Sequence, residues 1–401
     1  MRLLIYSHDT FGLGHLRRCR AIAHSLVESH PDLSVLILSG SPIIGSFGFR
    51  SRVDYVRFPG VVKLRNGGYT SQGLDISIED AIAMRETIIR SAAAAFNPHM
   101  FLVDKEPLGL RGEVEETLKQ LKARGTRLVL GLRDVLDDEE MLREEWDRKG
   151  VMSALDEFYD DIWVYGRQEV CDPLAGLGVS KSVREKISFT GYLRRSSSRV
   201  ADPSEDEQVE EPFVLVTTGG GGDGAALVDL VLQAYEQDPY IPQNALIVTG
   251  PFMHRDSQYD FRQRAERLKK VQTLPFTSNL EHLMIRADGV VAMGGYNTIC
   301  EILSFDKPSI IVPRTMPRLE QYIRASRMQE MGLLKMQMDD QPDGALAMAH
   351  AIRSLSSQTP PSRVSPPGFL DGLSNINKHF RTVIDRSKLD SPTLKLVTEA
   401  S

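Results

Sequence analysis

The sequence predicts an α/β fold made of two doubly wound parallel-sheet domains that face each other across a cleft. Short apolar runs alternate with longer amphipathic stretches along most of the 401 residues, the pattern of a parallel sheet with crossover helices. Several apolar runs end in glycines that open a helical pattern. An acidic stretch without apolar periodicity divides the repeats into two sets, and the length suits two substantial cores.

The first set of repeats occupies residues 1–190. Its strands are predicted at 2–6, 33–38, 100–103, 127–132 and 162–165, and its helices at about 15–29, 78–96 and 113–124. Residues 39–75 are too long for a simple connection, so we expect a functional or partly mobile segment there. Composition changes at Gly191, and residues 191–212 are predicted to be a solvated acidic linker.

The second set of repeats occupies residues 213–355. Its strands are predicted at 213–217, 245–249, 271–274, 290–293 and 309–312. Residues 356–401 follow as a proline-rich connection, an amphipathic carboxyl-terminal helix and a tail. This helix either closes the second domain or crosses back to the first.

Composition describes a soluble globular chain. Apolar residues make up 41% and charged residues 25%, and a net charge of −6 gives no reason to expect nucleic acid. No apolar run approaches the roughly 20 residues that span a bilayer, and the amino terminus has the pattern of a strand, not a signal peptide. Three scattered cysteines without metal-ligand spacing fit a reducing compartment, so we expect a cytoplasmic protein.

The stretch 288–327 carries the clearest functional pattern. An apolar run ends at Gly294 and Gly295, a helical pattern containing Glu301 follows, and a second apolar run begins after Pro308. A glycine turn lets a phosphate approach N–H groups at the positive end of a helix, and a carboxylate such as Glu301 can accept hydrogen bonds from a ribose diol. The pattern fits half of a nucleotide-sugar site, although Glu301 alone can also be a solvated helix residue.

The residues of this stretch resemble a known family. GGYNTICE, followed by P-x-x-x-P-x-x-E-Q-x-x-R-A, is similar to the carboxyl domain of GT-B glycosyltransferases, particularly the UDP-N-acetylglucosamine transferase that builds the peptidoglycan lipid precursor. The resemblance implies a GT-B fold. It also implies a ribose contact from Glu301, donor-sugar contacts from Glu320 and Gln321, and a place for Asn297 at the donor site.

The segment FGLGHLRRCRAIA, residues 11–23, resembles the amino-terminal loop of the same family and, more closely, the loop of the UDP-sugar hydrolase of pseudaminic acid synthesis. In both, the histidine of Gly-x-Gly-His lines the cleft, which implies His15 here, with Gly12 and Gly14 beside the donor. An imidazole titrates near neutral pH, so His15 is the candidate general base. The alternative is a histidine that caps the helix start.

Two further segments point to a diphosphate. FVLVTTGGGGDG places four consecutive glycines after a strand, and their N–H groups can converge on an anion. FTGYLRR, residues 189–195, resembles the family's Gly-x-x-x-Arg segment, which implies that Arg195 lies near the donor diphosphate. A flexible turn and solvated linker arginines are the alternatives. The glycines are Gly219, Gly220, Gly221 and Gly222.

Charged residues also follow two strands of the first domain. Asp104 and Glu106 end one strand, and Arg133 and Asp134 end another, so they are predicted to point at the cleft. They can orient an acceptor or support His15, or they can be loop charges. We take Asp104 and Asp134, with His15, as the catalytic candidates. The sequence has no Asp-x-Asp pair, so we expect neither a metal site nor a cofactor besides the UDP-sugar co-substrate.

The resulting hypothesis is transfer of a sugar from a UDP-sugar to an acceptor hydroxyl, with inversion, in polysaccharide or glycolipid synthesis. The acceptor can be a glycan, a lipid-linked molecule or a small molecule. Residues 296–298 are more polar than in the peptidoglycan enzyme, and arginines follow His15 at positions 17 and 18. These departures leave hydrolysis in the same cleft, or nucleotide-sugar binding without catalysis, as alternatives.

Residues 41–49, SPIIGSFGF, suggest a surface that contacts a membrane. Their large apolar side chains lie in an apparent loop, and exposed patches of this kind commonly bind a partner or a membrane. Nearby basic residues can attract anionic lipid, so we hypothesise peripheral contact at the inner face of the membrane. The alternative is that the apolar residues pack into the first domain. The residues concerned are Ile43, Ile44, Phe47 and Phe49, with Arg50, Arg52, Arg57, Lys63 and Arg65.

Overall fold

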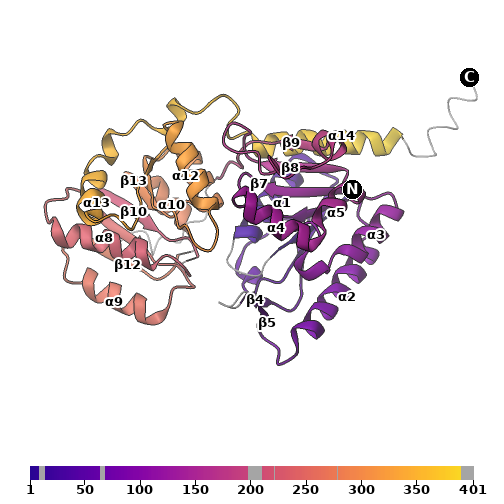
Figure 1. Cartoon of the computed structure of the whole chain (residues 1–401), viewed down its shortest axis with the longest axis horizontal. Coiled ribbons are helices and arrows are strands. Elements are labelled where there is room, and N and C mark those ends of the chain that lie inside the picture. Colours follow the sequence, from indigo (N-terminus) through magenta and orange to yellow (C-terminus); the bar gives the residue numbers. More distant parts are fainter. Residues whose placement is uncertain (9–13, 64–67, 197–209, 221, 278, 390–401) are drawn as a thin grey trace, which may run out of the picture.

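The computed structural model describes residues 1–8, 14–63, 68–196, 210–220, 222–277 and 279–389, and it contains two α/β domains (Figure 1). The described part of the first domain has a seven-stranded parallel sheet of order β3-β2-β1-β6-β7-β8-β9. The strands are β1 (Arg2–Ser7), β2 (Ser34–Ser39), β3 (Val53–Arg57), β6 (Met100–Asp104), β7 (Arg127–Arg133), β8 (Asp161–Tyr165) and β9 (Ile187–Phe189).

The strands of this sheet alternate with helices, as the sequence predicts. The helix α2 shows how local chemistry fixes the bounds: the hydroxyl of Ser77 accepts a hydrogen bond from the N–H of Asp80 at its start, and Asn97 ends it in the left-handed region. The helices are α1 (Gly14–Ser29), α2 (Ile78–Phe96), α3 (Glu115–Ala123), α4 (Glu139–Lys149), α5 (Val151–Glu157) and α6 (Lys181–Glu185).

The second domain repeats the architecture with a six-stranded parallel sheet of order β12-β11-β10-β13-β14-β15 in its described part. The strands are β10 (Phe213–Thr217), β11 (Asn244–Val248), β12 (Val271–Leu274), β13 (Gly289–Ala292), β14 (Ser309–Ile311) and β15 (Lys335–Met336). The helices are α8 (Ala225–Gln237), α9 (Arg255–Ala265), α10 (Leu280–Arg286), α11 (Tyr296–Ser304), α12 (Glu320–Glu330) and α13 (Gly344–Arg353).

The last helix, α14 (Gly372–Leu389), lies along the first domain and not on the second (Figure 1). Its Asn377 donates a hydrogen bond to Ser25 of α1 at 2.8 Å, and Phe380 packs against the ring of His30. The sequence leaves two arrangements open for this helix, and in the structure it crosses back to the first domain. The apolar stripe of this amphipathic helix covers an apolar face of the first domain, which the chain left about 180 residues earlier. Burial of that stripe holds the helix on the first domain.

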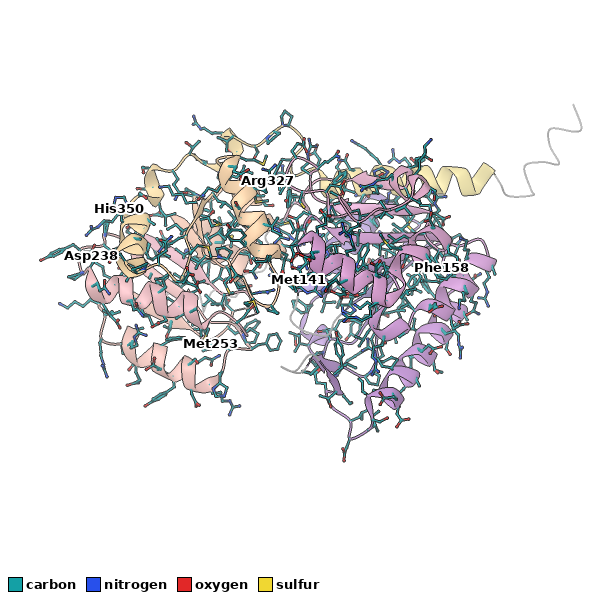
Figure 2. All side chains as sticks on the ribbon, viewed as in Figure 1. Met141, Phe158, Asp238, Met253, Arg327 and His350 are labelled. Atoms are coloured by element: carbon teal, nitrogen blue, oxygen red, sulfur yellow. The ribbon has the colours of Figure 1, made fainter. Side chains whose placement is uncertain are left out.

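Each domain has its own apolar interior, and a third cluster joins them. Figure 2 shows side chains filling both domains, with Phe158 in the first and Met253 in the second, both almost fully buried. The joining cluster includes Tyr192, Tyr296 and Phe369, whose rings stack with centroids 5.0 to 5.9 Å apart. The domains therefore meet through a packed apolar contact.

The described part of the stretch 39–75 has secondary structure of its own. It contains β3, an edge strand of the first sheet, and an antiparallel hairpin of β4 (Val61–Lys63) and β5 (Tyr69–Ser71). The sequence of β3, VDYVR, has charges at two of five positions, which an exposed edge strand tolerates and an apolar-run search misses.

The expectation of an exposed apolar patch at residues 41–49 is wrong. Ile44 is buried, and Ile43, Phe47 and Phe49 are at most partly exposed. Phe49 packs against His24 and Tyr55, because the loop folds back onto α1 and β3. In the part of the chain that the structure describes, no helix is both long and apolar enough to cross a bilayer.

Candidate functional site

The carboxyl ends of the strands of both sheets meet at the junction between the domains. In the first sheet, β1 and β6 are neighbours that lead to His8 and to Asp104. In the second, β10 and β13 are neighbours, and each leads through glycines into a helix. The helix α1 of the first domain contacts α11 of the second. Ligands of parallel α/β sheets bind at this edge.

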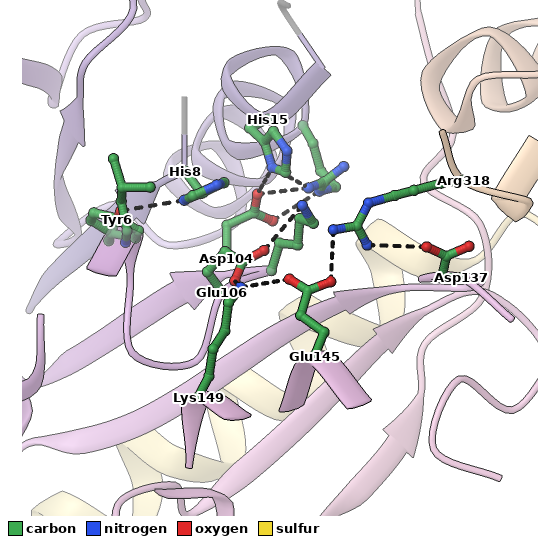
Figure 3. Close-up of polar contacts among 12 residues, drawn as sticks. Tyr6, His8, His15, Asp104, Glu106, Asp137, Glu145, Lys149 and Arg318 are labelled. Atoms are coloured by element: carbon green, nitrogen blue, oxygen red, sulfur yellow. Dashed lines mark hydrogen bonds and ion pairs between the residues drawn. The ribbon is translucent and has the colours of Figure 1, made fainter. Parts of the chain in front are cut away.

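The structure brings His15 and Asp104 together. Nδ1 of His15 lies 2.6 Å from Oδ2 of Asp104 (Figure 3). Asp104 is fully buried, and Arg18 donates to its Oδ1 at 2.9 Å and to its Oδ2 at 2.6 Å. Because the carboxylate is the nearest acceptor to Nδ1, we assign the proton of the neutral imidazole to Nδ1. Nε2 then keeps a lone pair for a substrate proton.

Burial sets the protonation state of this pair. It lowers the pKa of His15 to about 4, against the opposing effect of Asp104. Burial acts to raise the pKa of Asp104, but Arg18 and His15 outweigh it and hold that pKa well below its usual range. Near neutral pH the imidazole is uncharged and the carboxylate is ionised, which is the state that a general base requires.

A chain of alternating charges links the end of β6 to the second domain (Figure 3). Glu106 lies 3.1 Å from both Lys105 and Lys149. Lys149 also contacts Glu145, and Arg318 of the second domain reaches Glu145 at 2.8 Å. Glu106 is therefore paired with two lysines of its own domain, and the ion pair that reaches the second domain is that of Glu145 with Arg318.

Asp134 does not fit the catalytic part expected from sequence. It is fully buried and accepts two hydrogen bonds from Arg324 of the second domain, at 2.7 and 2.6 Å. The hydroxyl of Tyr192 donates a third at 2.7 Å. A buried carboxylate that accepts three hydrogen bonds, two of them from an arginine of the other domain, is held as the partner of that arginine, so we assign Asp134 to the domain contact and not to catalysis.

Glu301 lies inside α11 with its carboxylate at the junction. It is 1% exposed, and burial raises its pKa. Nη2 of Arg17, on α1, lies 2.6 Å from Oε1 of Glu301 and donates a hydrogen bond to Glu281 at 2.6 Å. Among the described residues, neither oxygen of Glu301 accepts a hydrogen bond of good geometry. A buried carboxylate without such partners suits a ligand that brings hydroxyl groups.

The amino-terminal turn of α11 contacts the amino-terminal turn of α1. Asn297 donates a hydrogen bond to the carbonyl of Gly14 at 2.9 Å. Arg195 donates to the amide oxygen of Asn297 at 2.6 Å, and its own N–H donates to Ser304 at 2.8 Å. The guanidinium of Arg195 therefore lies beside the positive end of α11, where an anion is favoured, while its backbone contacts the other end of the helix.

The glycines predicted to bind phosphate are partly described. Gly294 has φ +89°, and Gly219 has φ +69°, so both adopt a backbone conformation that side chains disfavour. The N–H of Gly219 donates to Thr217 at 3.2 Å, and the carbonyl of Gly220 accepts from Phe252 at 3.0 Å. Gly222 is an exposed residue before α8, and Gly295 is the residue before α11. Gly12 and Gly221 lie outside the described residues.

Glu320 and Gln321 begin α12 and are both nearly buried. Arg314 donates to Oε1 of Glu320 at 2.7 Å, and its backbone N–H donates to Oε1 of Gln321 at 3.3 Å. Oε2 of Glu320 has no hydrogen-bond partner among the described residues. The pair is thus fixed at the junction with one carboxylate oxygen available.

A hollow of about 520 Å³ lies beside the carboxyl end of β3. It is lined on one side by Arg57 and Phe58 and on the other by Leu74, which is 46% exposed. The rings of Phe58, Tyr6, His8 and His15 follow one another with centroids 6.5, 6.4 and 5.6 Å apart. The hollow therefore belongs to the first-domain side of the same edge.

Sequence reasoning missed three cationic residues of the site. Arg18 lies three residues after His15 on a helix, a spacing that indicates a common face, whereas Arg17, two residues after His15, lies on a different face. Arg324 was part of a family motif without an assigned role. Its partner lies 190 residues away in the other domain, so no local signal could have found the pair.

Comparisons with known proteins relate the second domain to glycosyltransferases. Residues 213–336 match the glycosyltransferase family 28 C-terminal domain. A peptidoglycan N-acetylglucosamine transferase of Alkaliphilus metalliredigens is 23% identical over 33% of this chain and 37% of its own length. An uncharacterized glycosyltransferase of Methanosarcina mazei is 30% identical over 38% of this chain and 38% of its own length. Another, of Methanosarcina acetivorans, is 22% identical over 75% of this chain and 77% of its own length. The chain thus spans well under half of the first two relatives.

Solved structures resemble the whole chain. MurG of Acinetobacter baumannii has a TM-score of 0.57 at 12% identity and covers 94% of this chain and 99% of its own. A UGT transferase of Siraitia grosvenorii, solved with UDP, has a TM-score of 0.62 at 15% identity and covers 96% and 99%. The chain has a GT-B fold, and its second domain resembles the corresponding domain of the peptidoglycan N-acetylglucosamine transferases.

Proposed function

We propose that this protein is a glycosyltransferase that moves a sugar from a UDP-sugar to an acceptor hydroxyl with inversion. The observation that carries the proposal is the placement of a neutral, largely buried imidazole, oriented by Asp104, two residues before the arginine that reaches Glu301. A base on the first domain and a ribose carboxylate on the second are thereby held at one junction. The match of residues 213–336 to a glycosyltransferase domain supports the same function.

The reaction is a single displacement. The acceptor O–H gives its proton to Nε2 of His15 as the oxygen attacks the anomeric carbon of the donor. The bond from that carbon to the phosphate oxygen breaks, and UDP leaves with the electron pair. The positive end of α11 and the guanidinium of Arg195 stabilise the charge that develops on the diphosphate. Asp104 stabilises the imidazolium that forms.

The donor would bind mainly to the second domain. Glu301 would accept hydrogen bonds from the ribose hydroxyls in place of Arg17. Phe276, which follows β12 and is 50% exposed, offers an aromatic face to the nucleoside base. Glu320, with its free oxygen, and Gln321 would contact the sugar. The hollow beside β3 would take part of the acceptor.

The proposal is tested with a panel of nucleotide sugars. Release of UDP is measured with and without glycan, lipid and small-molecule extracts. We expect release that depends on an extract. Release at the same rate without any extract would mean that water is the acceptor, and binding of a UDP-sugar with no release under either condition would mean that the protein does not catalyse transfer.

Glu301→Ala is expected to weaken UDP binding by about 1.5 to 3 kcal/mol, because a charge-assisted hydrogen bond to the ribose is lost. Calorimetry with UDP and with 2′-deoxy-UDP measures this contribution directly. The wild type should prefer UDP, and the variant should bind both nucleotides equally.

Glu281→Ala is the matched control for Glu301→Ala. Glu281 also pairs with Arg17, but its side chain is 27% exposed and lies in α10. Glu281→Ala should therefore change the contacts of Arg17 without changing the preference for UDP over 2′-deoxy-UDP. Equal loss of UDP affinity in both variants, with the 2′-hydroxyl preference kept, would show that Glu301 acts only through Arg17.

A further inference from the structure

Arg133 is a cation at the first-domain side of the junction. It ends β7, beside the strand that carries Asp104, and it is only partly exposed. Among the described residues it has neither a hydrogen bond nor an ion pair, and its Nε is buried and unsatisfied. Burial lowers the pKa of Arg133 to about 10, and Arg324 and Arg18 act in the same direction. Its guanidinium is nevertheless charged at neutral pH.

The carboxylates near Arg133 are already in use. Asp104 pairs with Arg18, and Asp134 pairs with Arg324. Glu320, whose charge acts most strongly on Arg133, pairs with Arg314. A partly exposed guanidinium whose Nε is buried and unsatisfied is costly in such surroundings unless a bound group supplies the missing negative charge.

We propose that Arg133 binds an anionic group, a phosphate or a carboxylate, that a substrate carries close to the reacting hydroxyl or the transferred sugar. The inference rests on the proposed function. The donor diphosphate does not account for Arg133, because the helix terminus and Arg195 that would hold it belong to the α11 side of the junction, whereas Arg133 ends β7, the strand next to the one that carries Asp104. The flat guanidinium can hold two oxygens of such a group at once.

Two substrates can carry this anion, and separate measurements distinguish them. In the first, protein saturated with UDP is titrated with inorganic phosphate and with acetate, so that the diphosphate position is occupied. Binding that Arg133→Met weakens by about 10- to 100-fold, the usual effect of losing a charged hydrogen bond, places the anion on the acceptor side. In the second, the affinities of UDP-glucose and UDP-glucuronate are compared. A preference for UDP-glucuronate that Arg133→Met abolishes places the anion on the transferred sugar.

Three controls keep the test decisive. Arg90→Met removes an arginine that is 48% exposed on α2 and should change neither measurement. Arg133→Lys retains charge without the fork and should have an intermediate effect, which guards against a folding failure of the methionine variant. A double-mutant cycle detects direct pairing between Arg133 and Glu320. It compares the free energies of unfolding of Arg133→Met, Glu320→Gln and the double variant.

The outcomes separate this inference from the proposed function. If UDP binds but neither the free anions nor the uronate show any dependence on Arg133, the inference is overturned and the donor site stands. If the double variant loses no more free energy of unfolding than either single variant, and no anion binding depends on Arg133, then Arg133 only pairs with Glu320. That result also overturns the inference. Failure of UDP itself to bind overturns the proposed function.

Discussion

Replacing His15 by glutamine is expected to lower turnover by about 100- to 10,000-fold while leaving donor affinity nearly unchanged. The donor contacts that we propose lie mainly on the second domain, whereas His15 belongs to the first. Glutamine keeps polarity and hydrogen bonding but cannot take up the acceptor proton. Initial rates at saturating donor and acceptor, together with UDP affinity from calorimetry, measure the two effects separately.

His24→Gln is the matched control. His24 lies on the same helix, and burial lowers its pKa to about 4 as well. Its Nε2 accepts a hydrogen bond from the backbone N–H of Arg50 at 3.3 Å, and its ring packs on Phe49, away from Asp104. His24→Gln should therefore keep wild-type turnover. If His15→Gln keeps it too, the base lies elsewhere.

The pH profile tests the same assignment. Because burial lowers the pKa of His15 to about 4, the base is neutral above that pH and protonated below it. We expect kcat/KM to be level from about pH 5 to 7 and to fall as pH drops through about 4, in contrast to the near-neutral titration expected of an unburied imidazole. The acidic limb should be absent from the residual rate of His15→Gln. A limb near pH 6.5 in the wild type would contradict the lowered pKa of His15.

Local patterns predict the parts of the site that depend on a single strand and the turn after it. The apolar run before Gly294 and the helix after it place Glu301 at the junction, as expected from sequence. His15 and Asp104 are 89 residues apart, but each follows a strand of one sheet, so their shared edge was predictable. Their direct contact was not, because it depends on the sheet order that makes β1 and β6 neighbours.

Contacts between the domains could not be predicted, since they depend on how two independent sheets are oriented. Asp134 looked like Asp104 in the sequence: both are aspartates at the carboxyl end of an apolar run. One faces the imidazole and the other faces Arg324, and only the placement of α12 distinguishes them. For the same reason Arg17, which crosses the junction to Glu301, carried no signal of its own.

Arg324→Met is expected to lower the free energy of unfolding by about 3 to 5 kcal/mol, because it leaves the carboxylate of Asp134 buried without its cation. It should also weaken UDP binding, since Arg324 donates to the carbonyl of Gly294 at 3.0 Å and so fixes the turn before α11. Denaturant unfolding monitored by two probes measures the first effect and shows whether the domains still unfold together.

Arg143→Met and the double variant Asp134→Asn with Arg324→Met complete the test. Arg143 pairs with Glu139 on the surface, with side chains 46% and 53% exposed, so its loss should cost less than about 1 kcal/mol. Removing the charge of Asp134 together with that of Arg324 should recover much of the lost stability, because the penalty comes from the unpaired buried charge and not from the missing contact itself. If the double variant is as unstable as Arg324→Met, the arginine stabilises the junction through its packing over Tyr296, where its guanidinium lies 5.9 Å from the ring centre.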